Sequence, residues 1–140
     1  MGAMIKLFGN NGFGVPLSIL IDADAAADTA TKYGIDVADL NQRSVWVSSP
    51  DLEAEYVQAL GSMVVWAAIE SSPLFSRNER GNCAATGSAG ARTDADVSAF
   101  CRRSKYKVRA AMVVAKLLSA QNAATVQSLN RLLGEIAVPQ

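Results

Sequence analysis

The sequence has no histidine, and its 140 residues include only two cysteines, Cys83 and Cys101. The cysteines do not form a CxxC pair, so zinc sites, Ser-His-Asp triads and Cys-His pairs are excluded within this chain. Any metal site has to use oxygen ligands, which favour Mg²⁺ or Mn²⁺ over zinc. So few cysteines are typical of a compartment that keeps thiols reduced, and we expect a cytoplasmic protein.

Long apolar runs are also missing, although 50% of the residues are apolar. No run approaches the roughly 20 residues of a membrane-spanning helix, and the first residues lack a signal-peptide layout. The phosphate-binding pattern GxxxxGK[ST] does not occur either. We expect one soluble domain with a real core and no membrane partner.

Net charge is zero, but the two signs are unevenly distributed. Residues 1–75 contain three Lys or Arg against nine Asp or Glu, and residues 76–140 contain ten against four. An acidic half and a basic half suit a metal site that acts on a phosphodiester, but two oppositely charged halves that fold against each other fit equally well. Within a single domain we therefore expect an acidic α/β core over about residues 1–75 and a basic helical extension over about 76–140.

One short stretch, residues 17–24 (LSILIDAD), organises the predicted fold. Its apolar residues fall on both faces of an extended segment, which is typical of a parallel strand covered by helices on both sides. Residues 44–48 (SVWVS) predict a second strand. The predicted fold class is α/β, a small parallel sheet between helices with a helical C-terminal extension. Helices are expected over about residues 25–33, 50–60, 64–69, 75–85, 93–101, 106–120 and 123–136, with a short helical or turn segment at 36–42.

Asp22 and Asp24 follow directly on the first predicted strand. Side chains two residues apart point to the same face of an extended chain, so both carboxylates can reach one divalent cation. The carboxyl end of a parallel strand is also where open α/β sheets bind ligands. The alternative is that one of them only caps the helix that begins near Ala25, since Asp is a favoured N-cap.

A second acidic group, Asp51, Glu53 and Glu55, follows the second predicted strand. If the two strands are neighbours, these carboxylates face Asp22 and Asp24 at one sheet edge, where a cation would relieve their repulsion. The alternative is an acidic first turn that complements the helix dipole.

The third feature is the basic tract at residues 101–111, CRRSKYKVRAA. A helical wheel places Lys105, Arg109 and Lys116 on one solvated ridge and Lys107 on the opposite, apolar side. A lysine on that side has to extend to solvent or meet an anion such as a bound phosphate. The candidate nucleic-acid contacts are Arg102, Arg103, Lys105 and Arg109.

Taken in order, the motifs LIDADAAADT, SSPDLEAEYVQALG and KYKVRAA resemble the Toprim domain of the overcoming-lysogenization-defect nucleases. The stand-alone Toprim nucleotidyl transferase/hydrolase proteins of actinobacteria are more similar still. The similarity runs over most of the chain and includes GAM near the start and SRNERGNCAATG at residues 76–87.

The resemblance implies a Toprim fold and phosphodiester cleavage or nucleotidyl transfer on nucleic acid, DNA in the first place, assisted by Mg²⁺ or Mn²⁺. The family's DxD falls on Asp22 and Asp24, and its Leu-Glu motif on Leu52 and Glu53. Its C-terminal lysine falls on Lys107, with Lys105 as the alternative. The implied metal ligands are then Asp22, Asp24 and Glu53, and the implied catalytic residues are Asp22 and Lys107, in a scheme where cations clamp the attacking and leaving oxygens.

The sequence departs from the family in one respect. Toprim domains carry a glutamate at the end of their first strand, and here no acidic residue precedes Asp22. We therefore expect weak or absent catalysis from the chain as given. The family's ATPase domain does not occur either, so the expected partners are a separate ATPase or a second copy of the chain that completes the sheet.

Two other functions remain open. A strand followed by DxD also opens the haloacid-dehalogenase-type phosphatases, but these want Thr or Val four residues after the first Asp, where this chain has Ala26. The other is a non-catalytic module that binds nucleic acid or protein through the basic tract. Its nucleic-acid binding would be sensitive to salt and indifferent to divalent metal.

Overall fold

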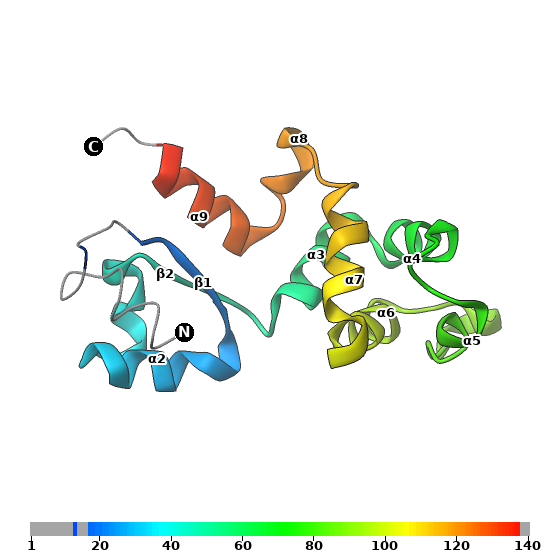
Figure 1. Cartoon of the computed structure of the whole chain (residues 1–140), viewed down its shortest axis with the longest axis horizontal. Coiled ribbons are helices and arrows are strands. Elements are labelled where there is room, and N and C mark those ends of the chain that lie inside the picture. The colour runs from blue at the N-terminus through cyan, green and yellow to red at the C-terminus, as the bar shows by residue number, and fades with distance from the viewer. Residues whose placement is uncertain (1–12, 14–16, 138–140) are drawn as a thin grey trace. The chain divides into compact units, whose positions relative to one another are not determined.

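The computed structural model describes Phe13 and residues 17–137, and these residues divide into two compact units. The first unit combines residues up to Asp51 with residues from Gln127 on, and the second spans Leu52–Val126. Figure 1 shows the elements of each unit. The GAM motif near the start lies outside the described residues.

The first unit is built on a two-stranded parallel sheet. Strand β1 (Ile19–Asp22) pairs with β2 (Val45–Ser48) in a register that places Ile19 opposite Val45 and Asp22 opposite Ser48. Both strands lie where the sequence predicts them, at the apolar stretch 17–24 and at residues 44–48. The polar residue Asp22 ends β1, as expected.

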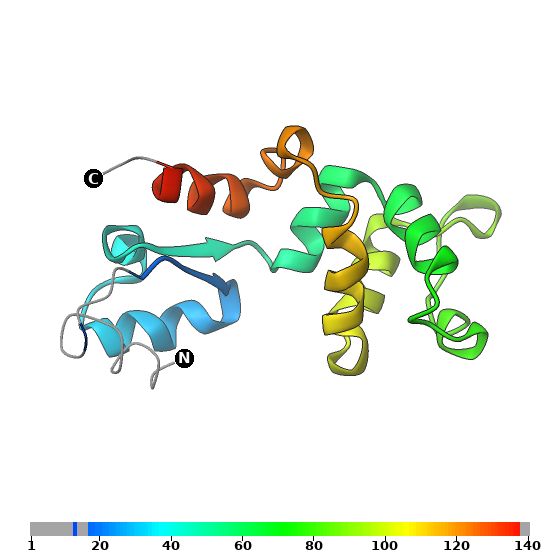
Figure 2. The same ribbon diagram turned by 45° about the horizontal axis from the view of Figure 1, so that its top comes forward.

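Helices cover both faces of this sheet, as the sequence predicts for a parallel pair. On one face, Ile21 and Val45 pack with Ala26, Ala30 and Leu40 from the segments between the strands. Helix α9 (Gln127–Ala137) packs on both strands, on the other side from α2 (Figure 2). The connecting segments are the 3-10 helix η1 (Ala23–Ala25), α2 (Ala26–Tyr33) and the 3-10 helix η2 (Val37–Arg43).

Helix α2 ends where a glycine allows it to end. Gly34 follows the helix with φ 67° and ψ 36°, a left-handed conformation that glycine adopts without a steric penalty. Its N–H donates to the carbonyl groups of Ala30 and Thr31, which satisfies the last turn. The predicted end of this helix is confirmed.

The second unit is entirely helical. Helix α3 packs on α6, and α4 packs on both α6 and α7. At the centre, the rings of Phe100 and Tyr106 stack with centroids 4.5 Å apart, and Trp66 meets Phe100 edge-on at 5.3 Å. The helices are α3 (Leu52–Leu60), α4 (Ser62–Ser71), α5 (Arg77–Arg80), α6 (Asp94–Arg102), α7 (Ser104–Ala115) and α8 (Ala120–Ala123), with the 3-10 helix η3 (Ser88–Gly90) before α6.

Several helix lengths differ from the predictions, and α4 has ten residues instead of six. Helix α5 has four residues instead of eleven, because Gly81 follows its Ser76–Glu79 capping box so closely. Helix α7 ends at Ala115 rather than near residue 120. The last predicted helix is interrupted between Ala123 and Gln127, so its two parts lie in different units.

The boundary between the units also falls elsewhere than the predicted change near residue 75. Helices α3 and α4 pack on α6 and α7, so they belong with the basic, helical part. Helix α9 packs on the strands and belongs with the sheet. The described residues contain no helix that is long and apolar enough to cross a membrane.

Candidate functional site

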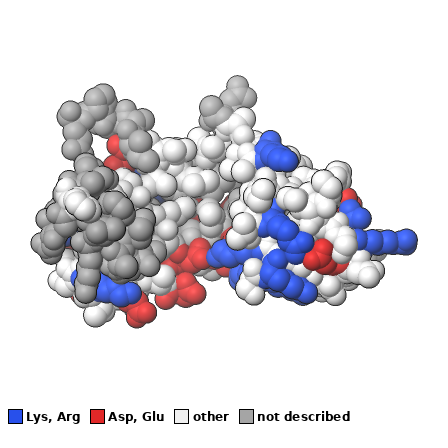
Figure 3. All heavy atoms as spheres, viewed as in Figure 1, with Lys and Arg blue, Asp and Glu red and all other residues white. Residues whose placement is uncertain are grey.

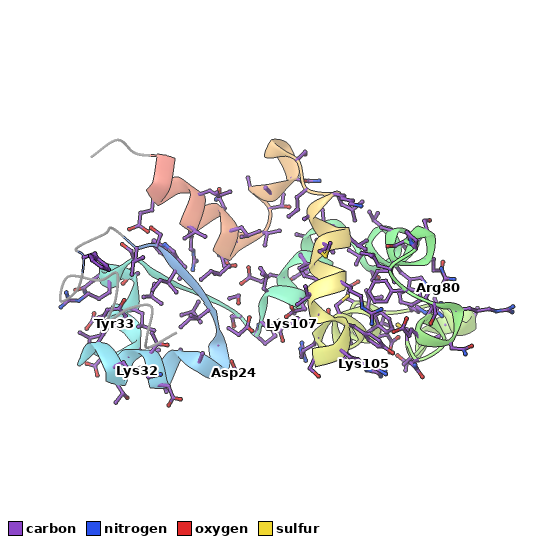
Figure 4. All side chains as sticks on the ribbon, viewed as in Figure 1. Asp24, Lys32, Tyr33, Arg80, Lys105 and Lys107 are labelled. Atoms are coloured by element: carbon purple, nitrogen blue, oxygen red, sulfur yellow. The ribbon has the colours of Figure 1, made fainter. Side chains whose placement is uncertain are left out.

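Asp22 and Asp24 lie at the carboxyl end of β1. The Ser48 hydroxyl, at the end of the neighbouring strand, donates to Asp22 Oδ1 at 3.2 Å and also lies 3.1 Å from the Ile21 carbonyl oxygen. Ser48 is fully buried, so it fixes the Asp22 carboxylate from the protein side. Asp24 lies in η1 and is exposed, on the turn that leaves the strand (Figure 4).

The capping alternative for these two residues is wrong. Helix α2 has Ala25 as its N-cap, with no side-chain hydrogen bond. Asp22 precedes η1, and its side chain makes no capping hydrogen bond there. The two carboxylates therefore have no capping role at the start of α2.

The second acidic group is divided between the units. Asp51 closes the first unit, whereas Glu53 and Glu55 lie in the first turn of α3 in the second. Within that second unit, the buried carboxylate of Glu53 lies 3.5 Å from the Lys107 ammonium nitrogen. Glu53 is 3% exposed and Lys107 43%, so the pair joins α3 to α7 at the edge of the core.

This ion pair answers one question that the sequence leaves open. Lys107 was expected either to extend to solvent or to meet an anion, and it meets one. The anion is Glu53, which the family resemblance assigns to the metal. The residue that the resemblance assigns to the metal and the lysine that it assigns to catalysis therefore contact each other.

No group of three or more His, Cys, Asp or Glu side chains gathers as a metal site within the described residues. Of the predicted ligands, Asp22 and Asp24 belong to the first unit and Glu53 to the second. The magnesium or manganese site stays a prediction.

Three of the four predicted nucleic-acid contacts are exposed. Arg102, Arg103 and Lys105 surround the junction between α6 and α7, and Figure 3 shows Lys and Arg side chains gathered on this unit. Lys105 projects from the start of α7, with its ammonium group 4.7 Å from the centre of the Tyr106 ring (Figure 4).

The predicted solvated ridge is wrong for its middle residue. The Arg109 guanidinium donates to Glu79 Oε1 at 2.8 Å and to the Leu74 carbonyl oxygen at 2.7 Å, and it lies over the Phe75 ring. The hydrogen bond from Arg109, followed by those from Ser76, holds the pKa of Glu79 near 2. Arg109 therefore acts inside the unit, holding α5 against α7.

Sequence reasoning missed two polar partners. The sequence marks Ser48 only as the end of a strand, although a parallel register places it beside Asp22. Nothing in the sequence joins Glu79 to Arg109, because the two residues lie 30 positions apart. The Ser76–Glu79 spacing, which forms a capping box, was the available local signal.

Comparison of the chain with protein families, with curated proteins and with solved structures gives no match.

Proposed function

We propose that the first unit binds Mg²⁺ or Mn²⁺ through Asp22 and Asp24, and that the chain acts on phosphodiesters of nucleic acid in the manner of Toprim domains. One observation carries the proposal. Two carboxylates lie at the carboxyl end of one parallel strand, and neither is used to cap the helix after it.

The chemistry of this sheet edge fits a hard cation. Carboxylate oxygens are the ligands that Mg²⁺ prefers, and the ion keeps several waters when only one or two carboxylates bind it. Ser48 holds Asp22 in place, and the exposed Asp24 lies two residues away. A cation bound there would act as a Lewis acid on a phosphoryl oxygen.

Glu53 and Lys107 enter this proposal differently from the two aspartates. Their ion pair gives each a partner in the second unit, so the proposal rests on Asp22 and Asp24 alone.

Metal binding is the first test. Titration of the protein with Mn²⁺, followed by electron paramagnetic resonance of the free ion, should show binding that weakens at least tenfold in Asp22→Asn and Asp24→Asn, about 1.4 kcal/mol or more. Asp36→Asn is the matched control, because Asp36 is exposed in the same unit and lies between α2 and η2. Equal binding by all four proteins would refute the proposed site.

Nicking of supercoiled plasmid in Mn²⁺ tests the chemistry separately. Activity that Asp22→Asn abolishes and Asp36→Asn retains would support the Toprim-like function. Metal binding without nicking would restrict the proposal to a metal-binding module. Nicking that persists without divalent metal would contradict it.

A second function, binding of nucleic acid without catalysis, is favoured by the exposed cations at the α6–α7 junction. Replacement of Arg102, Arg103 and Lys105 by Gln should weaken DNA binding and lower the slope of log K against log salt by about one per residue. Arg131→Gln is the control, since Arg131 is an exposed arginine on α9. An unchanged slope in the triple variant would exclude this surface.

A further inference from the structure

The outward face of α7 carries apolar side chains where a surface helix ordinarily carries polar ones. Val108 is 71% exposed and Met112 is 53% exposed, and the two lie one turn apart on the same face. Ala111 and Ala115, also exposed, lie beside them. These four residues form what we call the α7 apolar stripe.

The opposite side of the same helix is held firmly in the second unit. Tyr106, Ala110 and Val114 are each at most 2% exposed. On the flanks, Lys107 pairs with Glu53 and Arg109 with Glu79. The stripe is thus presented by a helix that is fixed on its other sides, which lowers the ordering cost of binding a partner.

The stripe is bounded at both ends by cations. Lys105 lies in its first turn and Lys116 directly follows the helix, and both are exposed. Among the described residues neither forms an ion pair, and α7 itself contains no acidic residue. Eleven helical positions separate the two lysines, which is about 16 Å along the axis.

Charge decides which occupant fits. In a symmetric pairing with a second copy, parallel or antiparallel, the lysines of one stripe would face the lysines of the other, so self-association is disfavoured. A lipid surface would need large apolar or aromatic side chains, and the stripe has only valine, methionine and alanine. The phosphates of a nucleic acid could bind the two lysines, but they would leave the exposed apolar side chains of Val108 and Met112 without an apolar partner.

We propose that the α7 apolar stripe is a docking surface for an acidic amphipathic helix of another protein. The partner presents two apolar side chains about one turn apart to Val108 and Met112. Its Asp or Glu residues lie about three turns apart and meet Lys105 and Lys116. This surface lies wholly on the second unit, whereas Asp22 and Asp24 belong to the first.

The test is a selection by the full-length protein from a displayed library of amphipathic helical peptides that carry acidic, neutral or basic flanking residues. Enriched peptides should have acids roughly eleven positions apart on either side of two apolar positions. A synthetic peptide of the enriched sequence should bind at least tenfold more weakly to Val108→Ser/Met112→Ser. Binding to Lys105→Gln/Lys116→Gln should be roughly fivefold weaker at low salt and lose most of its salt dependence.

Three controls keep the proposal falsifiable. Met63→Ser removes an exposed methionine from α4 and should leave peptide binding unchanged, and circular dichroism should show every variant folded. Enrichment of basic peptides would overturn the proposal. It would also be overturned if the wild type enriched no more peptides than Val108→Ser/Met112→Ser does in the same selection. Two other results would also overturn it. One is a concentration-dependent dimer, seen in sedimentation, that Val108→Ser/Met112→Ser abolishes. The other is binding to anionic vesicles that the same double variant abolishes.

Discussion

At the scale of single residues, backbone conformation decides what two positions can tolerate. Gly34 and Ser44 both follow a helical segment in the left-handed region, with φ of 67° and 54°. Glycine reaches this region freely, whereas serine does so at a steric cost. In return, the Ser44 hydroxyl donates to the Glu135 carboxylate, which joins η2 to α9.

Two glycine-to-alanine substitutions should therefore have opposite effects. Gly34→Ala should lower the free energy of unfolding by about 1 kcal/mol, because a Cβ is strained at this φ although no atom crowds it. Gly134→Ala, in the interior of α9 with open space around it, should raise stability by roughly 0.5–1 kcal/mol. Urea unfolding of both variants measures this, and a change of the same sign in both would contradict the argument.

The sequence predicts residue roles well where the interaction is local. The end of α2 at Gly34 and the start of α6 near residue 93 both follow from short patterns, and both are confirmed. The pairings of Arg109 with Glu79 and of Lys107 with Glu53 could not be predicted, because they depend on how α7 is rotated against α3 and α5. A helical wheel shows on which side of a helix a residue lies, but it does not identify the residue of another helix that faces it.

At the scale of elements, one carboxylate fastens α9 to the sheet. Glu135 accepts hydrogen bonds from the Ser44 hydroxyl, from the Trp46 indole nitrogen at 2.9 Å and from the Ser18 hydroxyl at 3.4 Å. The hydrogen bond from Ser44, and then that from Trp46, lowers the pKa of Glu135 below its ordinary value. The Glu135 hydrogen bonds therefore favour the ionised carboxylate.

Loss of this carboxylate should loosen α9. Glu135→Ala leaves the Trp46 indole without its acceptor and should cost about 1–2 kcal/mol of stability. The contribution of Glu135 is fully present above its ordinary pKa and disappears as the pH falls below it, because its folded pKa is the lower one. Urea midpoints from pH 7 downward test this: the wild type and Glu135→Ala should differ at pH 7, and the difference should shrink as the pH falls below the ordinary pKa of a glutamate.

A second carboxylate organises the loop before α6. Asp96 accepts from the Thr93 amide at 2.9 Å and the Thr86 amide at 3.0 Å, and these hydrogen bonds lower its pKa from 3.8 to about 2. Asp96→Asn should lower the urea midpoint at pH 7, because one amide oxygen cannot accept all of these bonds. The wild type should lose the same stabilisation as the pH falls from about 4 towards 2. A midpoint that is unchanged by the substitution would refute this role.

At the scale of the whole molecule, the first unit depends on two distant parts of the chain. Residues 17–51 supply the strands and the helices on one face, and residues from 127 on supply the helix on the other. The local pattern predicted the parallel sheet and its helical cover. The same pattern grouped the last helix with the basic helical extension, whereas α9 packs on the sheet. An amphipathic sequence does not specify which apolar surface its helix will cover.

Removal of residues 127–140 should therefore affect the two units differently. Amide protons of β1 and β2 should exchange faster with solvent, because one face of the sheet loses its cover. Amide protons of α6 and α7 should keep their protection, since their core of Phe100 and Tyr106 is unchanged. Hydrogen exchange followed by NMR measures both, with Arg131→Ala as a full-length control. A uniform loss of protection would show that the units do not unfold separately.

In the sequence, the second unit lies between the two segments that form the first unit. This order affects how the chain folds during synthesis. The helical unit, residues 52–126, is complete in the emerging chain before α9 has been translated. Strands β1 and β2 lie earlier in the sequence, but α9, which covers their second face, follows the helical unit. We therefore expect residues 52–126 to fold first on the ribosome. Strands β1 and β2 should reach their final packing only after α9 has been translated.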